Sequence, residues 1–245
     1  MGELIAILSG KGGTGKTSVC AGIATALAQA GSSVLCIDCD VGLRNLDISL
    51  GLADTASMSF LEVCRGEYNC DQIPRHPRFP MLAFLTAPVN CLADDIDLSA
   101  FSAMLRQARE QFQYVLLDAP AGLDAGFRLC AAFADRCVLV TGCEPAAVRD
   151  AARTGQQLEA MGKLDVRLVV NRVNKKLFST MDITVDDVMD RAGLPLLGVV
   201  PEDANVVLAA AFEEPLLDYT KKGAAAACRR IAKRLRGLPE PIKVR

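Results

Sequence analysis

The sequence predicts an α/β fold in which a mostly parallel, twisted sheet carries helices on both faces. Apolar, β-rich segments alternate with helix-length segments along the 245 residues, which is the rhythm of βαβ units. Residues 34–37 and 115–117 are apolar without alternation, as expected of central strands buried on both faces. A chain of this length can bury a large core, so we expect one domain over residues 1–245.

The pattern places strands at 4–8, 33–38, 81–86, 114–118, 136–141, 166–171 and 196–200. Helices are expected at 16–30, 97–112, 145–161 and 219–236. The turn-rich segments 66–80 and 86–97 are too short to link two domains. Residues 237–245 carry two prolines, so a flexible tail is expected there and not a helix.

Composition excludes several classes of protein. The net charge of -2 and the pI near 5.6 give no global basic field for non-specific nucleic-acid binding. No run approaches 18 apolar residues, and the chain starts on a strand without a basic leader, so neither a membrane span nor a signal peptide is expected. We therefore expect a cytoplasmic protein.

The ten cysteines do not form the pattern of a disulfide framework, because they are scattered through apolar segments. Cys36 and Cys39 are the one pair at metal or redox spacing. They lie at the end of a predicted strand, where alternate side chains point to opposite faces. Packing in the core is therefore favoured over a metal or redox site.

Residues 10–17, here called the phosphate loop, fit G-x-x-x-x-G-K-[ST] between a strand and a helix. The alternative, a glycine-rich turn that binds nothing, is disfavoured by this context. Glycines let backbone N–H groups converge on phosphate, and the helix directs its positive end at the same anion. A P-loop NTPase is thus predicted, with ATP and Mg²⁺ as cofactors and Lys16 on the phosphates. The expected nucleotide-binding residues here are Gly10, Lys11, Gly12, Gly13, Thr14, Gly15, Lys16, Thr17 and Ser18.

Carboxylates follow two of the predicted central strands. Asp40 lies just beyond the strand at 33–38, where it can orient water or Mg²⁺, and Asp118 ends the strand at 114–118. The expected metal ligands are Thr17, Asp40 and Asp118, directly or through water. Asp38 and Asp47 are better explained as caps of helices or turns.

Lys11 inside the phosphate loop gives the sequence a resemblance to the deviant Walker A ATPases of the MinD/ParA family. The segment Gly-Leu-Arg-Asn-Leu-Asp at 42–47 is closer to MinD-type members than to the plasmid-partition relatives. The resemblance implies an ATP-bound homodimer in which Lys11 reaches the partner's phosphates, with Lys11, Lys16 and Asp40 as catalytic residues. It also implies switch residues Asn45, Asp118, Pro120 and Gly122. A solvated loop lysine is the alternative for Lys11.

Two later segments, 169–172 and 199–203, extend the resemblance, which runs from about residue 3 to about residue 236. In the family these loops hold the adenine and ribose, which implies base contacts by Asn171, Arg172, Pro201, Glu202 and Asp203. An asparagine that closes a strand is as often a turn residue.

The C-terminal part departs from the MinD pattern, because no amphipathic anchor helix is expected beyond the core. Its basic residues are Arg229, Arg230, Lys233, Arg234, Arg236, Lys243 and Arg245. They could contact an anionic membrane surface at the periphery of the cell membrane, or nucleic acid. Cations on the solvent side of a last helix are the favoured interpretation.

The resulting hypothesis is a MinD-like ATPase that dimerises on Mg-ATP, acts as a spatial switch in division-site placement and is reset by hydrolysis. Regulatory activator or inhibitor proteins are expected partners, through a helix that carries Arg149, Asp150 and Arg153, although these side chains also suit a solvated face. The alternatives are a DNA-partition ATPase, a flagellar-placement ATPase and an iron–sulfur carrier that uses Cys36 and Cys39.

Overall fold

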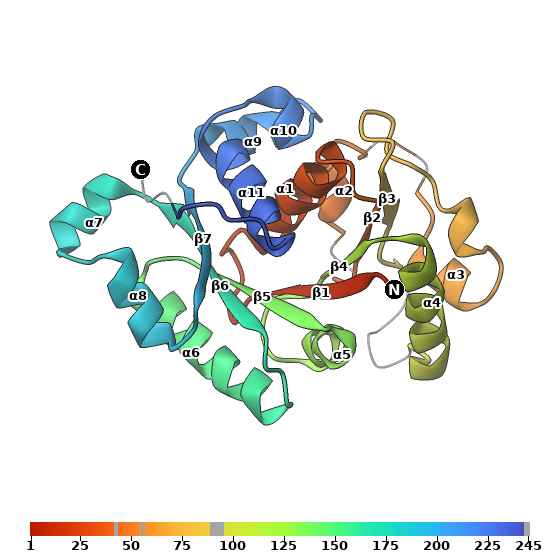
Figure 1. Cartoon of the computed structure of the whole chain (residues 1–245), viewed down its shortest axis with the longest axis horizontal. Coiled ribbons are helices and arrows are strands. Elements are labelled where there is room, and N and C mark those ends of the chain that lie inside the picture. The colour runs from red at the N-terminus through yellow and green to blue at the C-terminus, as the bar shows by residue number, and fades with distance from the viewer. Residues whose placement is uncertain (42–43, 54, 56, 89–95, 243–245) are drawn as a thin grey trace.

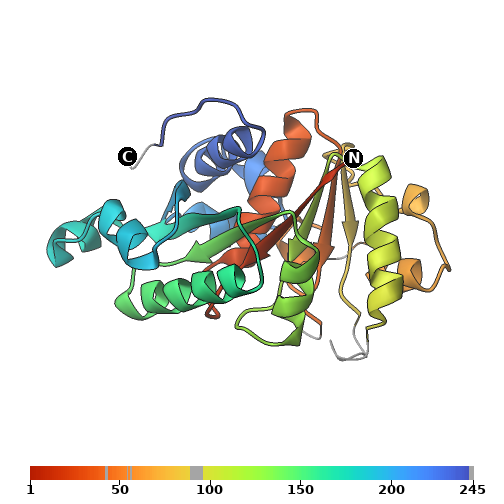
Figure 2. The ribbon, with the colours of Figure 1, turned by 60° about the horizontal axis from the view of Figure 1, so that its bottom comes forward.

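The structure is a computed structural model that describes residues 1–41, 44–53, 55, 57–88 and 96–242 (Figure 1). Several residues discussed above lie outside the described part: Gly42, Leu43, most of the turn-rich segment 86–97, and the basic residues Lys243 and Arg245. The N-terminal strand lies in the middle of the molecule, and helices flank the sheet on both sides (Figures 1 and 2).

The described residues form one seven-stranded sheet in which all neighbouring strands are parallel, in the order β3-β2-β4-β1-β5-β6-β7. The strands are β1 (Glu3–Leu8), β2 (Val34–Asp38), β3 (Leu82–Leu85), β4 (Tyr114–Asp118), β5 (Arg136–Thr141), β6 (Val166–Val173) and β7 (Leu196–Pro201). Every predicted strand is confirmed to within two residues at each end. Because β1 is central, the loop that follows it opens at the middle of the edge where the strands end, here called the carboxyl edge.

Two groups of helices cover the sheet. One face carries α1 (Lys16–Gln29), α2 (Leu46–Ser49), α9 (Ala204–Ala211), α10 (Leu216–Tyr219) and α11 (Gly223–Leu235). The other carries α3 (Phe60–Cys64), η1 (Cys70–Gln72), α4 (Leu98–Gln111), α5 (Ala125–Phe133), α6 (Pro145–Ala160), α7 (Lys175–Met181) and α8 (Val185–Ala192). The prediction of an α/β fold with helices on both faces is therefore confirmed.

The last helix differs from its expected span. The prediction placed it at 219–236, but Leu216–Tyr219 forms the short helix α10, and the backbone at Thr220 is extended. Helix α11 then starts at Gly223, whose φ of 55° lies in the left-handed region that glycine adopts without steric cost. The last helix thus starts four residues later than predicted, and the short helix α10 that precedes it was not predicted.

Of the nine cysteines in the described part of the chain, eight are buried and Cys64 is half-buried. Cys36 faces the layer of α1, where its sulfur lies 3.6 Å from that of Cys20, whereas Cys39 belongs to the opposite layer. Among the residues that the structure describes, no group of three or more His, Cys, Asp and Glu side chains is placed to hold a metal ion. This geometry supports packing over a cluster site at Cys36 and Cys39.

Most of the basic side chains of α11 bind the fold itself. Arg229 donates to the Gln29 side chain and to the Leu217 carbonyl, and Arg234 donates to the Leu197 carbonyl. Lys233 pairs with Glu240 at 2.9 Å. These contacts favour the structural interpretation of the basic helix. Within the described residues, no helix is long and apolar enough to cross a membrane.

Helices α1 and α11 approach closely because α1 carries Gly22 at their contact. A methyl group added at Gly22 would clash with the Cys228 sulfur. Glycine inside a helix costs about 1 kcal/mol relative to alanine, so close helix packing is the physical reason for this residue.

We expect Gly22→Ala to destabilise the protein by about 1 to 2 kcal/mol, because the overpacking penalty exceeds the gain in helix propensity. Adding Cys228→Ala should recover much of this loss. Urea unfolding of the wild type, both single variants and the double variant measures the coupling. If the double variant is no more stable than Gly22→Ala alone, the proposed contact is not what requires glycine.

Candidate nucleotide site

Strand register brings the carboxylates of β2 and β4 to the phosphate loop. Asp38 pairs in register with Asp118, and Asp118 pairs with Ile7 of β1, three residues before the loop begins. Both aspartates are buried, at 1% exposure each. The central strands thus end in two carboxylates beside the expected anion site.

The phosphate loop leaves the start of α1 open for an anion. Gly13 and Gly15 both have a φ of 80°, and α1 begins directly after them at Lys16. The N-terminus of α1 has no side-chain cap and no acidic residue in its first turn. Its unpaired N–H groups and its helix dipole therefore favour a bound anion.

Lys16 forms a buried ion pair with Asp118, with 2.7 Å between Nζ and Oδ1. Burial alone would lower the pKa of Lys16, but the Asp118 carboxylate outweighs it, so the pKa is raised and the ammonium stays charged. Thr17 lies next to this pair, since its hydroxyl oxygen is 3.4 Å from the Lys16 nitrogen. The expected phosphate lysine and the expected metal ligands Thr17 and Asp118 are therefore together.

Asp38 organises the loop that follows β2. Its carboxylate accepts hydrogen bonds from the backbone N–H groups of Asp40 at 2.9 Å and of Asn45 and Leu46 at 3.2 Å each. Because Leu46 begins α2, Asp38 caps this short helix from the neighbouring strand, as the capping interpretation predicted. Burial and the Asp118 charge raise the pKa of Asp38 to about 6, against the three hydrogen bonds that lower it.

The other predicted switch residues lie around the loop. Asp40 is half-buried, and burial raises its pKa against the smaller opposing effect of the Lys16 charge. Asn45 is exposed at the start of α2. Gly122 has a φ of 97° and donates its N–H to the Ser9 carbonyl, and Pro120 packs against Gly126 of α5.

A cavity of about 320 Å³ adjoins the phosphate loop between α1, β7, α9 and α11. Its lining includes the predicted residues Gly15, Ser18, Asn171, Arg172, Pro201, Glu202 and Asp203. The Asn171 amide nitrogen donates to the Thr14 carbonyl at 2.8 Å, so this residue joins the cavity to the phosphate loop. Arg172 is exposed, with a φ of 55° at a register shift in β6.

Two of these predicted residues have structural partners. Glu202 accepts from the Asn174 amide at 2.7 Å. Asp203 accepts from Asn205 N–H through one oxygen and from Ala224 N–H through the other, so it caps both α9 and α11. The sequence analysis did not predict the apolar residues of the lining, which are Val206, Val207, Leu216 and Cys228. These residues reach the cavity only because the helices α9, α10 and α11 pack together.

Buried hydroxyl groups at the phosphate loop lack hydrogen-bond partners, as expected where a phosphate ligand binds. Within the described residues, the buried hydroxyl of Thr14 has no hydrogen-bond partner, and neither has that of Ser9 directly before the loop. A buried polar group without a partner costs free energy, which a ligand oxygen would recover. The oxygen atoms of Thr17, Asp118 and Asp40 are of the chemical type that Mg²⁺ prefers.

Comparison with known proteins gives the family. Residues 5–216 match the family model described as the CobQ/CobB/MinD/ParA nucleotide binding domain. This chain belongs to that family. The septum site-determining protein MinD of Synechocystis sp. is 36% identical over 245 residues, which span 99% of this chain and 92% of the relative.

Solved structures of the CobQ/CobB/MinD/ParA family share the fold over nearly the whole chain. The MinC:MinD cell division protein complex of Aquifex aeolicus contains a chain that is 33% identical, with a TM-score of 0.90 and 98% coverage of both chains. MinD of Pyrococcus horikoshii OT3, described as complexed with Mg-ADP, is 27% identical, with a TM-score of 0.83 and 96% coverage of both chains. The resemblance stated from the sequence motifs is thus confirmed.

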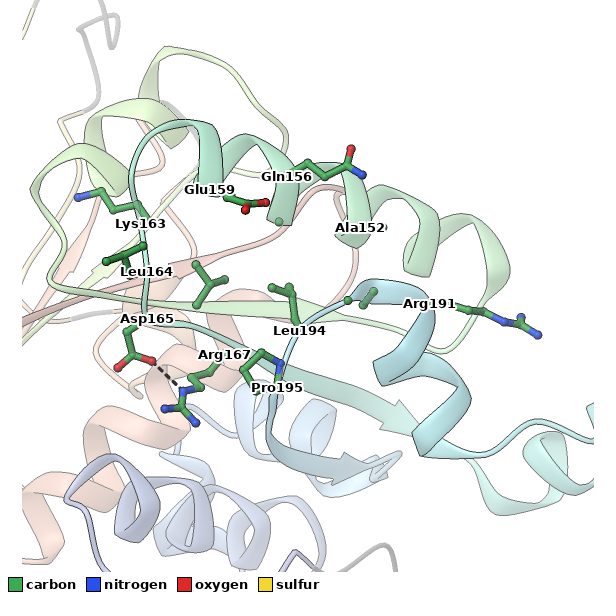
Figure 3. Close-up of a pocket in the computed structure, with 14 residues that line it drawn as sticks. Ala152, Gln156, Glu159, Lys163, Leu164, Asp165, Arg167, Arg191, Leu194 and Pro195 are labelled. Atoms are coloured by element: carbon green, nitrogen blue, oxygen red, sulfur yellow. Dashed lines mark hydrogen bonds and ion pairs between the residues drawn. The ribbon is translucent and has the colours of Figure 1, made fainter.

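A second cavity, of about 780 Å³, lies at the opposite edge of the sheet between α6, α8 and the start of β6 (Figure 3). Three of its charged side chains bind each other or the fold. Arg167 pairs with Asp165 at 2.7 Å, and Lys163 donates to the Ala132 and Ala134 carbonyls at the end of α5. None of the predicted site residues lines it, so this cavity is a poorer candidate than the one at the phosphate loop.

We expect a carbon-detected NMR titration of the aspartate carboxyl groups to show Asp38 titrating near pH 6. Asp118→Asn should move this pKa down, because it removes a charge that raises it. Asp97, whose pKa is lowered by hydrogen bonds from Ser99, serves as the control that should not move.

The raised pKa of Asp38 makes the free energy of unfolding depend on pH. Between about pH 4 and pH 6 the folded protein keeps a proton on Asp38 that the unfolded chain has released. This group therefore lowers the free energy of unfolding as the pH rises through that window, by about 3 kcal/mol in total. An Asp38 carboxyl group that titrates near pH 4 would contradict the described burial.

Proposed function

We propose that this protein is an ATPase that dimerises on binding Mg-ATP, acts as a spatial switch in the placement of the division site and is reset by hydrolysis. The observation that carries the proposal is the convergence of Lys16, Asp118 and the Asp38-held loop at the open N-terminus of α1. The division role is supported by the relatives, which are named as septum site-determining proteins.

In this proposal the chain's own residues hold the phosphates and the metal. Lys16 and the N–H groups of the phosphate loop bind the β- and γ-phosphates, and Thr17, Asp118 and Asp40 hold Mg²⁺ directly or through water. The metal, when bound, neutralises charge on the phosphates. Asp40 orients the attacking water from the loop that Asp38 anchors. Structures of the P. horikoshii relative with Mg-ADP support this choice of cofactor.

The cavity beside the loop is proposed to hold the base and ribose. The Asn171 side-chain nitrogen donates to the Thr14 carbonyl. The Asn171 side-chain oxygen is therefore the atom proposed to accept a hydrogen bond from a purine amino group. Pro201 and the apolar side chains of α9 and α11 offer a surface for the flat base. Asp203 is proposed to act mainly by fixing the two helices that form the cavity.

Lys11 and α6 are proposed as contacts with other chains. Lys11 is exposed in the phosphate loop, as expected of a side chain that reaches the phosphates of a second copy. Arg149 and Arg153 are exposed on α6, and within the described residues their side chains form no ion pair. We propose this face for a regulator of the division-site system, as the MinC complex of the A. aeolicus relative suggests.

We expect Asp40→Ala to bind ATP with wild-type affinity, to lose ATP hydrolysis by about a hundredfold or more and to persist as a dimer in ATP. Lys16→Ala is the contrasting variant and should lose nucleotide binding, because its ammonium is removed from the anion site. Phosphate release, binding of a fluorescent ATP and light scattering give the three readings. Normal hydrolysis by Asp40→Ala would exclude Asp40 from the reaction.

The DNA-partition alternative is tested by co-sedimentation with DNA and, in parallel, with anionic vesicles, under ATP and ADP. We expect no pelleting with DNA even at low salt, because the net charge is -2 and most of the cations of α11 bind the fold. Pelleting with vesicles in ATP alone would support peripheral contact with the membrane. ATP-dependent DNA pelleting that falls steeply with salt would favour the partition role.

A further inference from the structure

Three sulfur-bearing side chains from three separate elements, here called the sulfur cluster, come together between α3, η1 and α4. Cys64 ends α3, Cys70 begins η1, and Met104 lies in the middle of α4. The Cys64 sulfur lies 3.8 Å from the Met104 sulfur, and the Cys70 sulfur lies 3.9 Å from the backbone oxygen of the same methionine. Helices α3 and α4 lie side by side at one end of the molecule (Figures 1 and 2). None of the three residues lines the cavity beside the phosphate loop, so the sulfur cluster is separate from the candidate nucleotide site.

The sulfur cluster has a route to solvent. Of the nine cysteines in the described part of the chain, Cys64 alone is not buried. Cys70 and Met104 are buried, at 1% and 2% exposure. The Cys70 sulfur also lies 3.9 Å from the side-chain oxygen of Gln107, which is exposed. A metal ion can therefore arrive at Cys64, whereas the two other sulfur atoms are kept from water.

The chain between the two cysteines is held in place by local structure. Gly66 turns the chain directly after α3, with a φ of 73° that glycine adopts without steric cost. The backbone N–H of Asn69 donates to the side-chain oxygen of Gln72 at 2.8 Å, which fixes the start of η1. Donors that are already positioned lose little conformational freedom when a ligand binds. Cys64 and Cys70 are therefore preorganised beside α4.

The donor atoms and their spacing suit a soft monovalent metal ion. Thiolate and thioether sulfurs together are the ligands that select copper(I). With metal–sulfur bonds of about 2.3 Å, two sulfurs of a trigonal site lie about 4.0 Å apart, close to the 3.8 Å between Cys64 and Met104. Zinc takes four nitrogen, oxygen or thiolate ligands, and within the described residues no third His, Cys, Asp or Glu completes a group with the two cysteines. The sulfur cluster thus matches copper(I) better than zinc.

We propose that Cys64, Cys70 and Met104 bind one copper(I) ion through two thiolates and one thioether. Burial, as the largest cause, raises the pKa of Cys64 to about 12 and that of Cys70 to about 11, so both thiols carry a proton in the metal-free protein. Binding therefore breaks two S–H bonds, forms two copper–thiolate bonds and releases two protons to solvent, and copper stays in the +1 state. The metal would tie α3 and η1 to α4, independently of the proposed nucleotide function.

The test is an anaerobic titration of the protein with copper(I) against bicinchoninate, a chelator whose copper(I) complex is coloured. We expect the wild type to withdraw one copper(I) per chain from the chelator. Cys64→Ser removes a thiolate and should raise the dissociation constant at least about a hundredfold. Met104→Leu keeps the volume and apolar character of the side chain, so the fold is retained, and should raise that constant at least about tenfold. Wild-type affinity in either variant would overturn the three-sulfur site.

Cys36→Ser is the matched control. Cys36 belongs to another close sulfur pair, in which its sulfur lies 3.6 Å from that of Cys20, but both members are fully buried in the layer of α1. This substitution should change the dissociation constant less than about threefold, and a loss of copper(I) in Cys36→Ser alone would place the metal there and overturn the inference.

X-ray absorption at the copper edge gives a second measurement that does not depend on affinity. We expect three sulfur ligands at about 2.3 Å in the wild type and two in Met104→Leu. A wild type that withdraws no copper(I), or that retains Zn²⁺ in its place, would show that the sulfur cluster serves only for packing or for another metal, and the inference would fail.

Discussion

A buried ion pair between Lys16 and Asp118 joins the phosphate loop to the strand beside it, and the rest of the site is arranged around that contact. It forms because β4 lies next to β1, so a lysine at the start of α1 meets a carboxylate from the neighbouring strand. Breaking such a pair on one side leaves a buried charge, at a cost of roughly 3 to 5 kcal/mol. Anything that draws Lys16 toward a phosphate must therefore compensate Asp118, which is the role that Mg²⁺ fills in the proposed mechanism.

The same register places Asp38, which holds the loop after β2, beside this ion pair. Asp38 lies beside Asp118, and its charge is disfavoured by burial and by that neighbour. Three backbone N–H groups hold it, and they belong to the segment that carries Asp40. A change in charge at Asp118 would thus reach Asp40 through one shared carboxylate.

On the other side of the loop, Asp203 fixes two of the helices that line the adjoining cavity. One carboxylate caps α9 and α11 together, so the helix that lines the cavity also holds a fixed place against the last helix. Val207 of α9 lines this cavity and is also 70% exposed, so apolar surface of α9 lies beside the cavity.

The sequence by itself determined the seven strands, the phosphate loop and the acidic ends of β2 and β4. These features depend on local patterns: continuous apolar runs for strands buried on both faces, and glycines where the backbone must adopt a positive φ. It placed the start of the last helix at residue 219 and not at Gly223, because the start depends on the extended backbone at Thr220 and on a cap from Asp203, about twenty residues away.

Only the tertiary structure decided which partner each carboxylate has. No single segment of the sequence determines the order of the strands in the sheet. The contacts of Lys16 with Asp118 and of Asp38 with the backbone N–H of Asp40 could therefore not be assigned from the sequence. The lining of the cavity beside the phosphate loop and the exposed face of α9 likewise depend on how distant helices pack. Local spacing fixes which side chains share a helix face, whereas the rest of the fold decides which face is left to solvent.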